Sequence, residues 1–314
     1  MKESSLKRKK IGVLMGGLSR EREISLRTGK AILKALVEKG YKACPIDVSH
    51  EVAERLMKEK IEIAFNALHG RYGEDGTIQG MLEIMGIPYT GSGVLASALA
   101  LHKITAKKIL SYEKIPTPSF EFLRREEIER DPPRRISLPI PLVVKPAREG
   151  STIGISIVKK EEELLPAIKE AGRYDEEILI EEFMKGKEIT VGILNDIPLP
   201  IIEIAPRSGF YDYHSKYTKG ETQYIIPAQI PREKYLYAQE ISLRVFKVFG
   251  CSGFARVDLM TDEEGNPFVI DVNTMPGMTE TSLLPKAAEF VGISFGELVE
   301  RILLGASLKL ESGK

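Results

Sequence analysis

Cysteine, net charge and long apolar runs are all scarce in this sequence, and each scarcity argues against a class of protein. The 314 residues include two cysteines, Cys44 and Cys251, which is not the pattern of a disulfide-stabilised secreted domain. Basic and acidic residues number 45 each, so the total charge indicates neither a nucleic-acid nor a membrane partner. The apolar run at 11–15 is too short for a signal peptide, and no run approaches membrane-spanning length. We therefore expect a cytoplasmic protein.

The length and the order of the patterns predict more than one domain. A chain of 314 residues exceeds what one hydrophobic core usually serves, so two or three domains are expected. In the first hundred residues the expected strands alternate with helices, in the order strand 11–15, helix 24–40, strand 43–48, helix 51–58 and strand 61–68. This alternation predicts a parallel α/β sheet, and ligands bind beyond the carboxyl ends of such strands.

The remaining two thirds are predicted to be α+β with antiparallel hairpins. We expect the following elements: helix 94–112, strand 115–123, a polar helix and turn over 126–141, two strands within 141–158, helix 161–172, two strands within 176–194, helix 232–249, two strands within 253–273 and helical structure over 282–306. The sequence has no internal repeat and no low-complexity tract.

The stretch VIDVNTMPGMT (269–279) places a carboxylate and a carboxamide on one strand. Asp271 and Asn273 are two residues apart, so their side chains point to the same face. Arg256 and Asp258 have the same spacing on the preceding strand, and the turn DEEGN between the strands predicts a hairpin. Two carboxylates and an amide oxygen suit Mg²⁺. The alternative is a surface salt bridge from Arg256 to Asp258 or Asp271, and we favour the metal.

Two further segments are typical of nucleotide binding, although each has a plain structural alternative. In KPAREGSTIG (145–154), Lys145 precedes small residues whose backbone N–H groups can approach phosphate oxygens, whereas an ordinary hairpin loop is the alternative. In ILIEEFMKGKEI (178–189), a strand opens into Glu181 and Glu182, with Glu188 after the turn. Such a strand end can hydrogen-bond an adenine ring and hold ribose hydroxyls, whereas a solvated acidic edge is the alternative.

Polar residues at the ends of the first and third expected strands are candidates for substrate contacts. In GGLSREREISL, Ser19 is expected to cap a helix, with Glu21 and Arg22 in its first turn. Glu21 can equally face the crevice and hold an ammonium group. His69, at the end of the third strand, is either a polar contact in the crevice or a structural histidine.

Taken together and in order, these motifs resemble the D-alanine–D-alanine ligases of the ATP-grasp superfamily. The resemblance extends from about residue 11 to about residue 304 and rests on GGLSREREISL, ALHGRYGEDGTIQGMLEIMGIPYTGSGV, VVKPAREGSTIGIS, FYDYHSKY, ETQY and NTMPGMTETSLLP. It implies an ATP-grasp fold, in which an N-terminal parallel α/β domain (1–102) precedes a central domain (103–188) and a C-terminal catalytic domain (189–314). A mobile loop is implied at 206–224, and its small and aromatic residues suit a lid over ATP.

The resemblance also implies an activity for peptidoglycan precursor synthesis and a role for each matching residue. One D-alanine carboxylate attacks the γ-phosphate of ATP, and the amine of a second D-alanine then displaces phosphate from the acyl phosphate. Glu21 holds the first ammonium, with His69 nearby, and Ser151 and Tyr217 complete a network with Glu21. Arg256 and the N–H of Gly277 form the oxyanion site.

The residues implied to bind ATP, metal and the second D-alanine lie in later motifs. Phosphates are contacted by Lys103, Lys145 and Lys216. The adenine pocket is lined by Glu181, Glu182, Phe183 and Met184, and Glu188 meets the ribose. Two Mg²⁺ ions, for which Mn²⁺ is a substitute, are held by Asp258, Asp271 and Asn273. The second D-alanine carboxylate binds near Ser282 and Leu283.

The resemblance further implies a homodimer, an amine as second substrate because of Tyr217, and one departure from the family pattern. The family usually has Glu where this chain has Asp271, which is one methylene shorter. The shorter side chain is expected to affect metal affinity rather than the type of reaction. Two rival hypotheses stay open: an ATP-grasp ligase for another small carboxylate and an amine or hydroxy acid, and a nucleotide-binding regulator without turnover.

Overall fold

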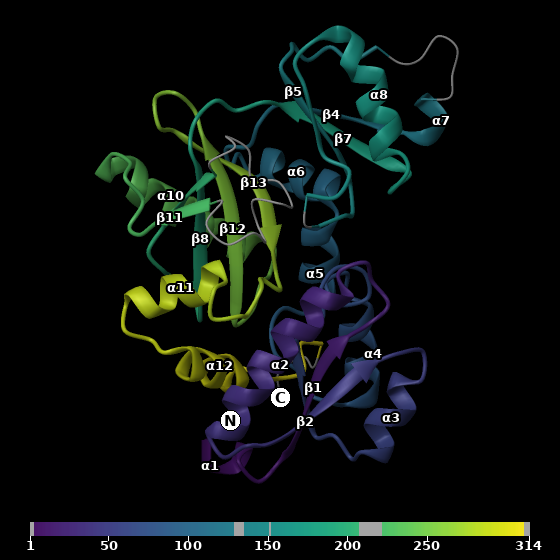
Figure 1. Cartoon of the computed structure of the whole chain (residues 1–314), viewed down its shortest axis with the longest axis vertical. Helices are drawn as coiled ribbons and strands as arrows, with labels where there is room; N and C mark the ends of the chain where they lie inside the picture. The colour runs from purple at the N-terminus through teal and green to yellow at the C-terminus, as the bar shows by residue number, and fades with distance from the viewer. Residues whose placement is uncertain (1–2, 129–134, 151, 207–221, 311–314) are drawn as a thin grey trace.

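The computed structural model describes residues 3–128, 135–150, 152–206 and 222–310. It contains three sheets, arranged around the middle of the molecule (Figure 1). Ser151, Lys216, Tyr217 and most of the loop predicted at 206–224 lie outside the described residues. In the described part of the chain, no helix combines the length and apolar character needed to cross a membrane.

The first sheet is parallel and has the predicted alternation of strands and helices. Its order is β2-β1-β3, and β1 pairs in parallel with both neighbours. The elements of this region are α1 (Glu3–Leu6), β1 (Lys10–Gly16), α2 (Arg22–Glu38), β2 (Lys42–Val48), α3 (Val52–Lys58), β3 (Ile63–Asn66) and α4 (Thr77–Met85). β1 and β3 are buried along almost their whole lengths, as expected of strands covered on both faces. Helix α4 follows a glycine-rich segment, and no helix was predicted at its position.

The helical stretch predicted over 94–112 is present but divided, because the structure has two helices there. They are α5 (Val94–Leu101) and α6 (Lys103–Tyr112), separated by His102 with an extended backbone (φ −82°, ψ 90°). His102 Nδ1 accepts the N–H of Thr105 at 3.2 Å and so caps α6. The break makes Lys103 the first residue of a new helix, whose direction differs from that of α5 (Figure 1).

The second sheet is antiparallel, with the order β4-β7-β5-β6. Its region contains β4 (Phe120–Arg124), α7 (Arg125–Ile128), β5 (Leu142–Pro146), β6 (Ser156–Val158), α8 (Glu161–Ala171) and β7 (Glu177–Glu182). The strand predicted at 115–123 begins only at Phe120, because Pro116 and Pro118 have no N–H to donate to a ladder. Part of the predicted polar helix and turn lies outside the described residues.

The third sheet has the order β11-β10-β8-β12-β13, and β9 also pairs with β8. Its region contains β8 (Glu188–Leu194), β9 (Ile197–Pro198), β10 (Ile202–Pro206), β11 (Thr222–Ile225), α10 (Arg232–Val248), β12 (Phe254–Thr261), β13 (Pro267–Asn273), α11 (Leu283–Phe290) and α12 (Phe295–Leu304). Strands β9, β10 and β11 carried no prediction. The helical structure predicted over 282–306 is divided near Gly292, which has a positive φ of 82°.

Helix α12 returns to the first sheet and packs against α2 (Figure 1). A single buried cluster contains Ile32 and Leu36 of α2 together with Leu298 and Ile302 of α12. Glu300 accepts hydrogen bonds from Lys39 Nζ at 2.8 Å and Tyr41 Oη at 2.7 Å. The domain boundaries at 102 and 188 stay predictions, although each sheet lies within one predicted segment apart from the first residue of β8.

Candidate functional site

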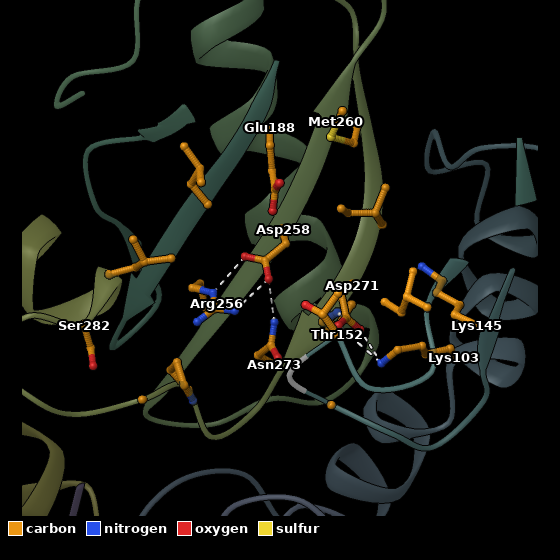
Figure 2. Close-up of a pocket in the computed structure, with 18 of the residues that line it drawn as sticks. Lys103, Lys145, Thr152, Glu188, Arg256, Asp258, Met260, Asp271, Asn273 and Ser282 are labelled. Atoms are coloured by element: carbon orange, nitrogen blue, oxygen red, sulfur yellow. Dashed lines mark hydrogen bonds and ion pairs between the residues drawn. The ribbon is translucent and has the colours of Figure 1, made fainter. Parts of the chain in front are cut away.

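One cleft of about 1200 Å³ lies between the three sheets and contains every described residue for which a site role was predicted. Those lining residues are Glu21, His69, Lys103, Lys145, Glu181, Glu182, Phe183, Met184, Glu188, Arg256, Asp258, Asp271, Asn273, Gly277, Ser282 and Leu283. They come from segments up to about 260 positions apart in sequence, so the fold, not local sequence, brings them together. Figure 2 shows the charged centre of this cleft.

The hairpin β12–β13 has the register that the sequence pattern requires. Arg256 lies opposite Asn273, and Asp258 lies opposite Asp271, so all four side chains share one face (Figure 2). The register shifts at Asp258/Leu259, leaving Ile270 on β13 without a partner residue on β12. This β-bulge was not predicted, because Ile270 is apolar like the buried Val269 before it, which hides the shift in alternation that an extra residue causes. It allows Ile270 and Asp271, adjacent in sequence, both to line the cleft.

Asp258 is the centre of a hydrogen-bonded group at the floor of the cleft. Arg256 donates to its two oxygens at 2.8 and 2.7 Å, which is the bidentate geometry. Asn273 Nδ2 donates at 2.9 Å and Thr190 Oγ1 at 2.6 Å. The ion pair that was the alternative to a metal site therefore forms, but it lies inside the cleft and Asp258 is only 9% exposed.

Lys103 and Asp271 form a second ion pair, which joins helix α6 to strand β13. Lys103 Nζ lies 3.3 Å from each carboxylate oxygen (Figure 2). Burial works to raise the pKa of Asp271, but Lys103, and then Lys145, lower it overall. Burial likewise works to lower the pKa of Lys103, and Asp271 more than offsets this effect and raises it. Both groups are therefore held in their charged forms.

A third charged group was not predicted in full. Glu181 is 3% exposed and pairs with Lys145 of β5 through one oxygen and with Lys107 of α6, at 2.6 Å, through the other. Burial opposes ionisation of Glu181, yet the two lysines lower its pKa. Sequence reasoning identified Glu181 and Lys145 but missed Lys107, although its position four residues after Lys103 places both on one face of a helix.

The end of the cleft beside Glu181 suits an aromatic ring. Met260 and Ile270 line it together with Phe183 and Met184, so apolar side chains come from both antiparallel sheets. The N–H groups of Glu182 and Phe183 donate to the carbonyls of Ser119 and Pro141 at 2.9 and 3.1 Å, which anchors this segment. Met260 has the parity of Asp258 on β12, so the strand period could have identified it.

At the other end of the cleft, Glu21 and His69 lie in the loops that follow β1 and β3 of the first sheet. The prediction that Ser19 caps α2 is wrong, because the helix begins at Arg22 with Glu21 in the cap position. Ser19 Oγ instead donates to the carbonyl of His69 at 2.6 Å and accepts the N–H of Glu21 at 3.2 Å. Ser19 therefore ties the loop after β1 to the loop after β3, which brings Glu21 close to His69.

His69 is buried and held from both sides. Thr28 Oγ1 lies 3.0 Å from its Nε2, and Glu74 Oε1 lies 3.1 Å from its Nδ1. The loop of the second sheet approaches the same place, since a Cβ on Gly150 would stand 2.9 Å from Glu21 Oε2. His69 is therefore a hydrogen-bonded buried histidine that also lines the cleft, and its contact with a substrate stays a prediction.

The turn after β13 carries the remaining predicted residues. Ser282 precedes α11, and its Oγ accepts the N–H of Thr279 at 3.1 Å. A Cβ on Gly277 would lie 3.1 Å from that same Oγ, so a glycine permits the close approach of the two segments. Gly277, Ser282 and Leu283 therefore line the cleft from the turn after β13 and the start of α11.

The donor set at the cleft centre matches a hard cation. In the described ranges, no three His, Cys, Asp or Glu side chains lie close enough together to hold a metal by themselves. The carboxylates of Asp258 and Asp271 and the amide of Asn273 nevertheless share one face of the hairpin. Two carboxylates and an amide oxygen leave coordination positions for phosphate oxygens and water, which is how Mg²⁺ binds in phosphoryl-transfer sites.

Two family models match the chain. The model described as D-ala D-ala ligase C-terminus matches residues 109–304, and the one described as D-ala D-ala ligase N-terminus matches residues 50–92. The chain is 56% identical to a D-alanine–D-alanine ligase of Syntrophotalea carbinolica, covering 98% of this chain and 100% of the relative. It is 52% identical to one of Geotalea uraniireducens, with 99% of each covered.

Solved structures show the same likeness. The D-alanine–D-alanine ligase of Bacillus anthracis in complex with ATP has a TM-score of 0.82 and 37% identity, covering 95% of this chain and 97% of that one. The VanG D-Ala:D-Ser ligase of Enterococcus faecalis has a TM-score of 0.77 and 31% identity, covering 94% and 98%.

Proposed function

This chain belongs to the D-alanine–D-alanine ligase family, and we propose that its cleft joins two D-alanine molecules through an acyl phosphate formed from ATP. The product, D-alanyl-D-alanine, is a precursor of peptidoglycan. The observation that carries this proposal is the convergence of all the described site residues on one cleft. This convergence supports a cleft that holds a nucleotide beside a small substrate.

ATP is proposed to lie between the two antiparallel sheets. The apolar walls formed by Met260 and Ile270 suit the adenine ring, and Glu188 at the start of β8 suits the ribose hydroxyls. Lys103 and Lys145 then face the phosphates as fixed cations, which stabilise the charge that spreads over them during transfer. Lys216, outside the described residues, is proposed to add a third cation.

Asp258, Asp271 and Asn273 are proposed to hold Mg²⁺, because their oxygens share one face of the hairpin beside the lysines. When bound, Mg²⁺ would neutralise phosphate charge and orient the phosphates. The chain's own part is to present these oxygens from a rigid antiparallel pair. Asn273 must turn its amide oxygen toward a cation, since its nitrogen donates to Asp258 here.

D-Alanine is proposed to bind at the end of the cleft beside the first sheet. Glu21 supplies a carboxylate for the ammonium of the first D-alanine, and His69 lies nearby. Arg256 and the N–H of Gly277 face the carbonyl oxygen that becomes negative when the second amine attacks. Ser282 and Leu283 line the place of the second carboxylate, while Ser151 and Tyr217 are proposed to close the network around Glu21.

The direct test is to incubate the purified protein with ATP, Mg²⁺ and D-alanine and to measure phosphate release and dipeptide by mass spectrometry. We expect stoichiometric phosphate and D-alanyl-D-alanine. D-Serine should be offered as second substrate as well, because one similar structure is a D-Ala:D-Ser ligase. Preferred formation of D-alanyl-D-serine would replace the substrate assignment, and nucleotide binding without any product would favour a regulator.

The compartment and the oligomeric state stay predictions of the same proposal. ATP as a substrate makes the cytoplasm the expected compartment, and a homodimer is the expected assembly. Light scattering of the purified chain should give twice its mass of 35.0 kDa.

A further inference from the structure

Lys107 is a buried charge to which the proposed reaction has so far given no role. It is 1% exposed on helix α6, and Lys103 precedes it by one helical turn. Its ammonium lies 2.6 Å from Glu181 and donates to Thr117 Oγ1 at 2.7 Å. Thr117 in turn donates to the carbonyl of Val269 on β13 at 2.7 Å. Burying a charged lysine costs free energy unless the charge is paired, so the position of Lys107 needs an explanation.

The surroundings of Lys107 join both sheets that enclose the proposed ATP site. Glu181 belongs to β7 of the second sheet, whereas Val269 belongs to β13 of the third sheet. On the far side, Glu181 also pairs with Lys145 of β5. Lys107 and Lys145 therefore contact opposite oxygens of the Glu181 carboxylate, and Lys145 is the lysine proposed to bind phosphate.

Charge counting shows what Lys107 changes. Lys145 and Glu181 by themselves sum to zero, so an incoming phosphate would meet a neutralised pair. With Lys107 the three groups sum to one positive charge, and Glu181 shares its two oxygens between two ammonium groups. The attraction between Lys145 and a phosphate is correspondingly larger, because buried charges are weakly screened.

We propose that Lys107 is a positioning residue that balances Glu181 and thereby leaves the Lys145 ammonium available to nucleotide phosphates. This inference rests on the proposed function, because it takes Lys145 as a phosphate contact. It adds a group that need not touch the nucleotide but controls the net charge that the nucleotide meets.

The protonation of Lys107 gives the inference a measurable signature. Burial lowers the pKa of Lys107 to about 8, with Glu181 opposing this effect and Lys145 adding to it. The other charged group acting on it is Asp271 of β13, whose carboxylate favours the charged lysine. Above that pH the free protein should lose the balancing charge, so nucleotide affinity should fall while the fold persists.

The experiment measures the Kd of MgADP by calorimetry between pH 7 and 9.5 for the full chain and three variants. For the unmodified protein we expect weaker binding as pH rises through about 8. Lys107→Met should weaken binding about tenfold at pH 7.5 and remove this pH dependence. Lys108→Met is the matched control, because Lys108 is exposed on the same helix and lies over the ring of Phe122.

Thr117→Val covers the case in which Lys107→Met fails to fold. It keeps the side-chain volume but removes the hydroxyl that locates Lys107, so binding should weaken about threefold with the pH dependence retained. Unchanged affinity and an unchanged pH profile in the foldable variants would overturn the inference. Absence of MgADP binding by the unmodified protein would instead overturn the proposed function, and this inference with it.

Discussion

The two ends of the cleft are built in different ways. At the end beside the first sheet, His69 is held by Thr28 and Glu74, and Ser19 ties its loop to that of Glu21, so these contacts arise within residues 19–74. At the nucleotide end, Lys103 reaches Asp271 from 168 positions away, and Glu181 joins lysines from two other elements. The contacts around His69 therefore arise within one short segment of the chain, whereas the charge pairs at the nucleotide end join elements far apart in sequence.

The difference suggests how each end responds to its ligand. The short-range hydrogen bonds at the substrate end can stay in place when a small zwitterion binds. The buried ion pairs at the nucleotide end have already lost much of their hydration, so a phosphate or a cation must compete with an existing partner. We therefore expect substitutions among the buried ion pairs, Arg256–Asp258 included, to change catalysis strongly, and substitutions in the hydrogen-bonded group around His69 to change mainly the KM for D-alanine.

The largest effect should come from Arg256→Met. Removing the guanidinium takes away the charge proposed to stabilise the oxyanion and leaves Asp258 without its bidentate partner. We expect kcat to fall by roughly 10²–10³-fold, with a much smaller change in the Kd of MgADP. Arg301→Met, on the surface of α12, is the matched control and should keep full activity. A variant with near-normal kcat would remove Arg256 from the reaction.

Substitution of Asp271 should have the next largest effect. Two substitutions at this position distinguish a role in ion pairing from a role in metal binding. Asp271→Ala should raise the Mg²⁺ concentration needed for half-maximal rate by about tenfold or more, because a charged ligand is lost. Asp271→Glu should retain activity, since the family usually has Glu there. The measurement is the initial rate against Mg²⁺ at saturating ATP, and an unchanged Mg²⁺ dependence in Asp271→Ala would refute the assignment.

His69→Gln should have the smallest effect and should be confined to the substrate end. The amide can replace only part of the bonding to Thr28 and Glu74, a loss of about 1 kcal/mol. We expect the KM for D-alanine to rise about fivefold while the Kd of MgADP is unchanged. Equal changes in both constants would show that the two ends are coupled, which would break the contrast drawn above.

Much of this architecture follows from local patterns, and the hairpin is the best example. The spacing of Arg256, Asp258, Asp271 and Asn273, with a glycine-containing turn between the strands, was enough to place them on one face. The bulge at Ile270 was not predictable, because Ile270 is apolar like the buried Val269 before it and so hides the shift in alternation. The helix break at His102 was missed for a related reason, since 94–112 is continuous in helical pattern and only the cap shows the break.

The roles of buried charges depended on partners that a sequence does not reveal. In the sequence alone, Lys107 resembles an ordinary surface lysine. Only the fold shows that Glu181 and Thr117 contact its ammonium. Serine is a common residue at helix caps, but Ser19 donates a hydrogen bond to the carbonyl of His69, because the loop after β3 offers an acceptor close by. Tertiary contacts determine the partners of both side chains, and secondary-structure propensity does not predict such contacts.

The return of α12 to α2 sets the order in which the chain can complete its cores. Ile32 and Leu36 are buried partly by Leu298 and Ile302, which leave the ribosome some 260 residues later. Until then these side chains of α2 lack their partners on α12, and apolar surface exposed in this way is where nascent chains aggregate or bind chaperones. The nucleotide cleft and the packing of α12 on α2 are therefore both completed only after residues 283–304 have been synthesised.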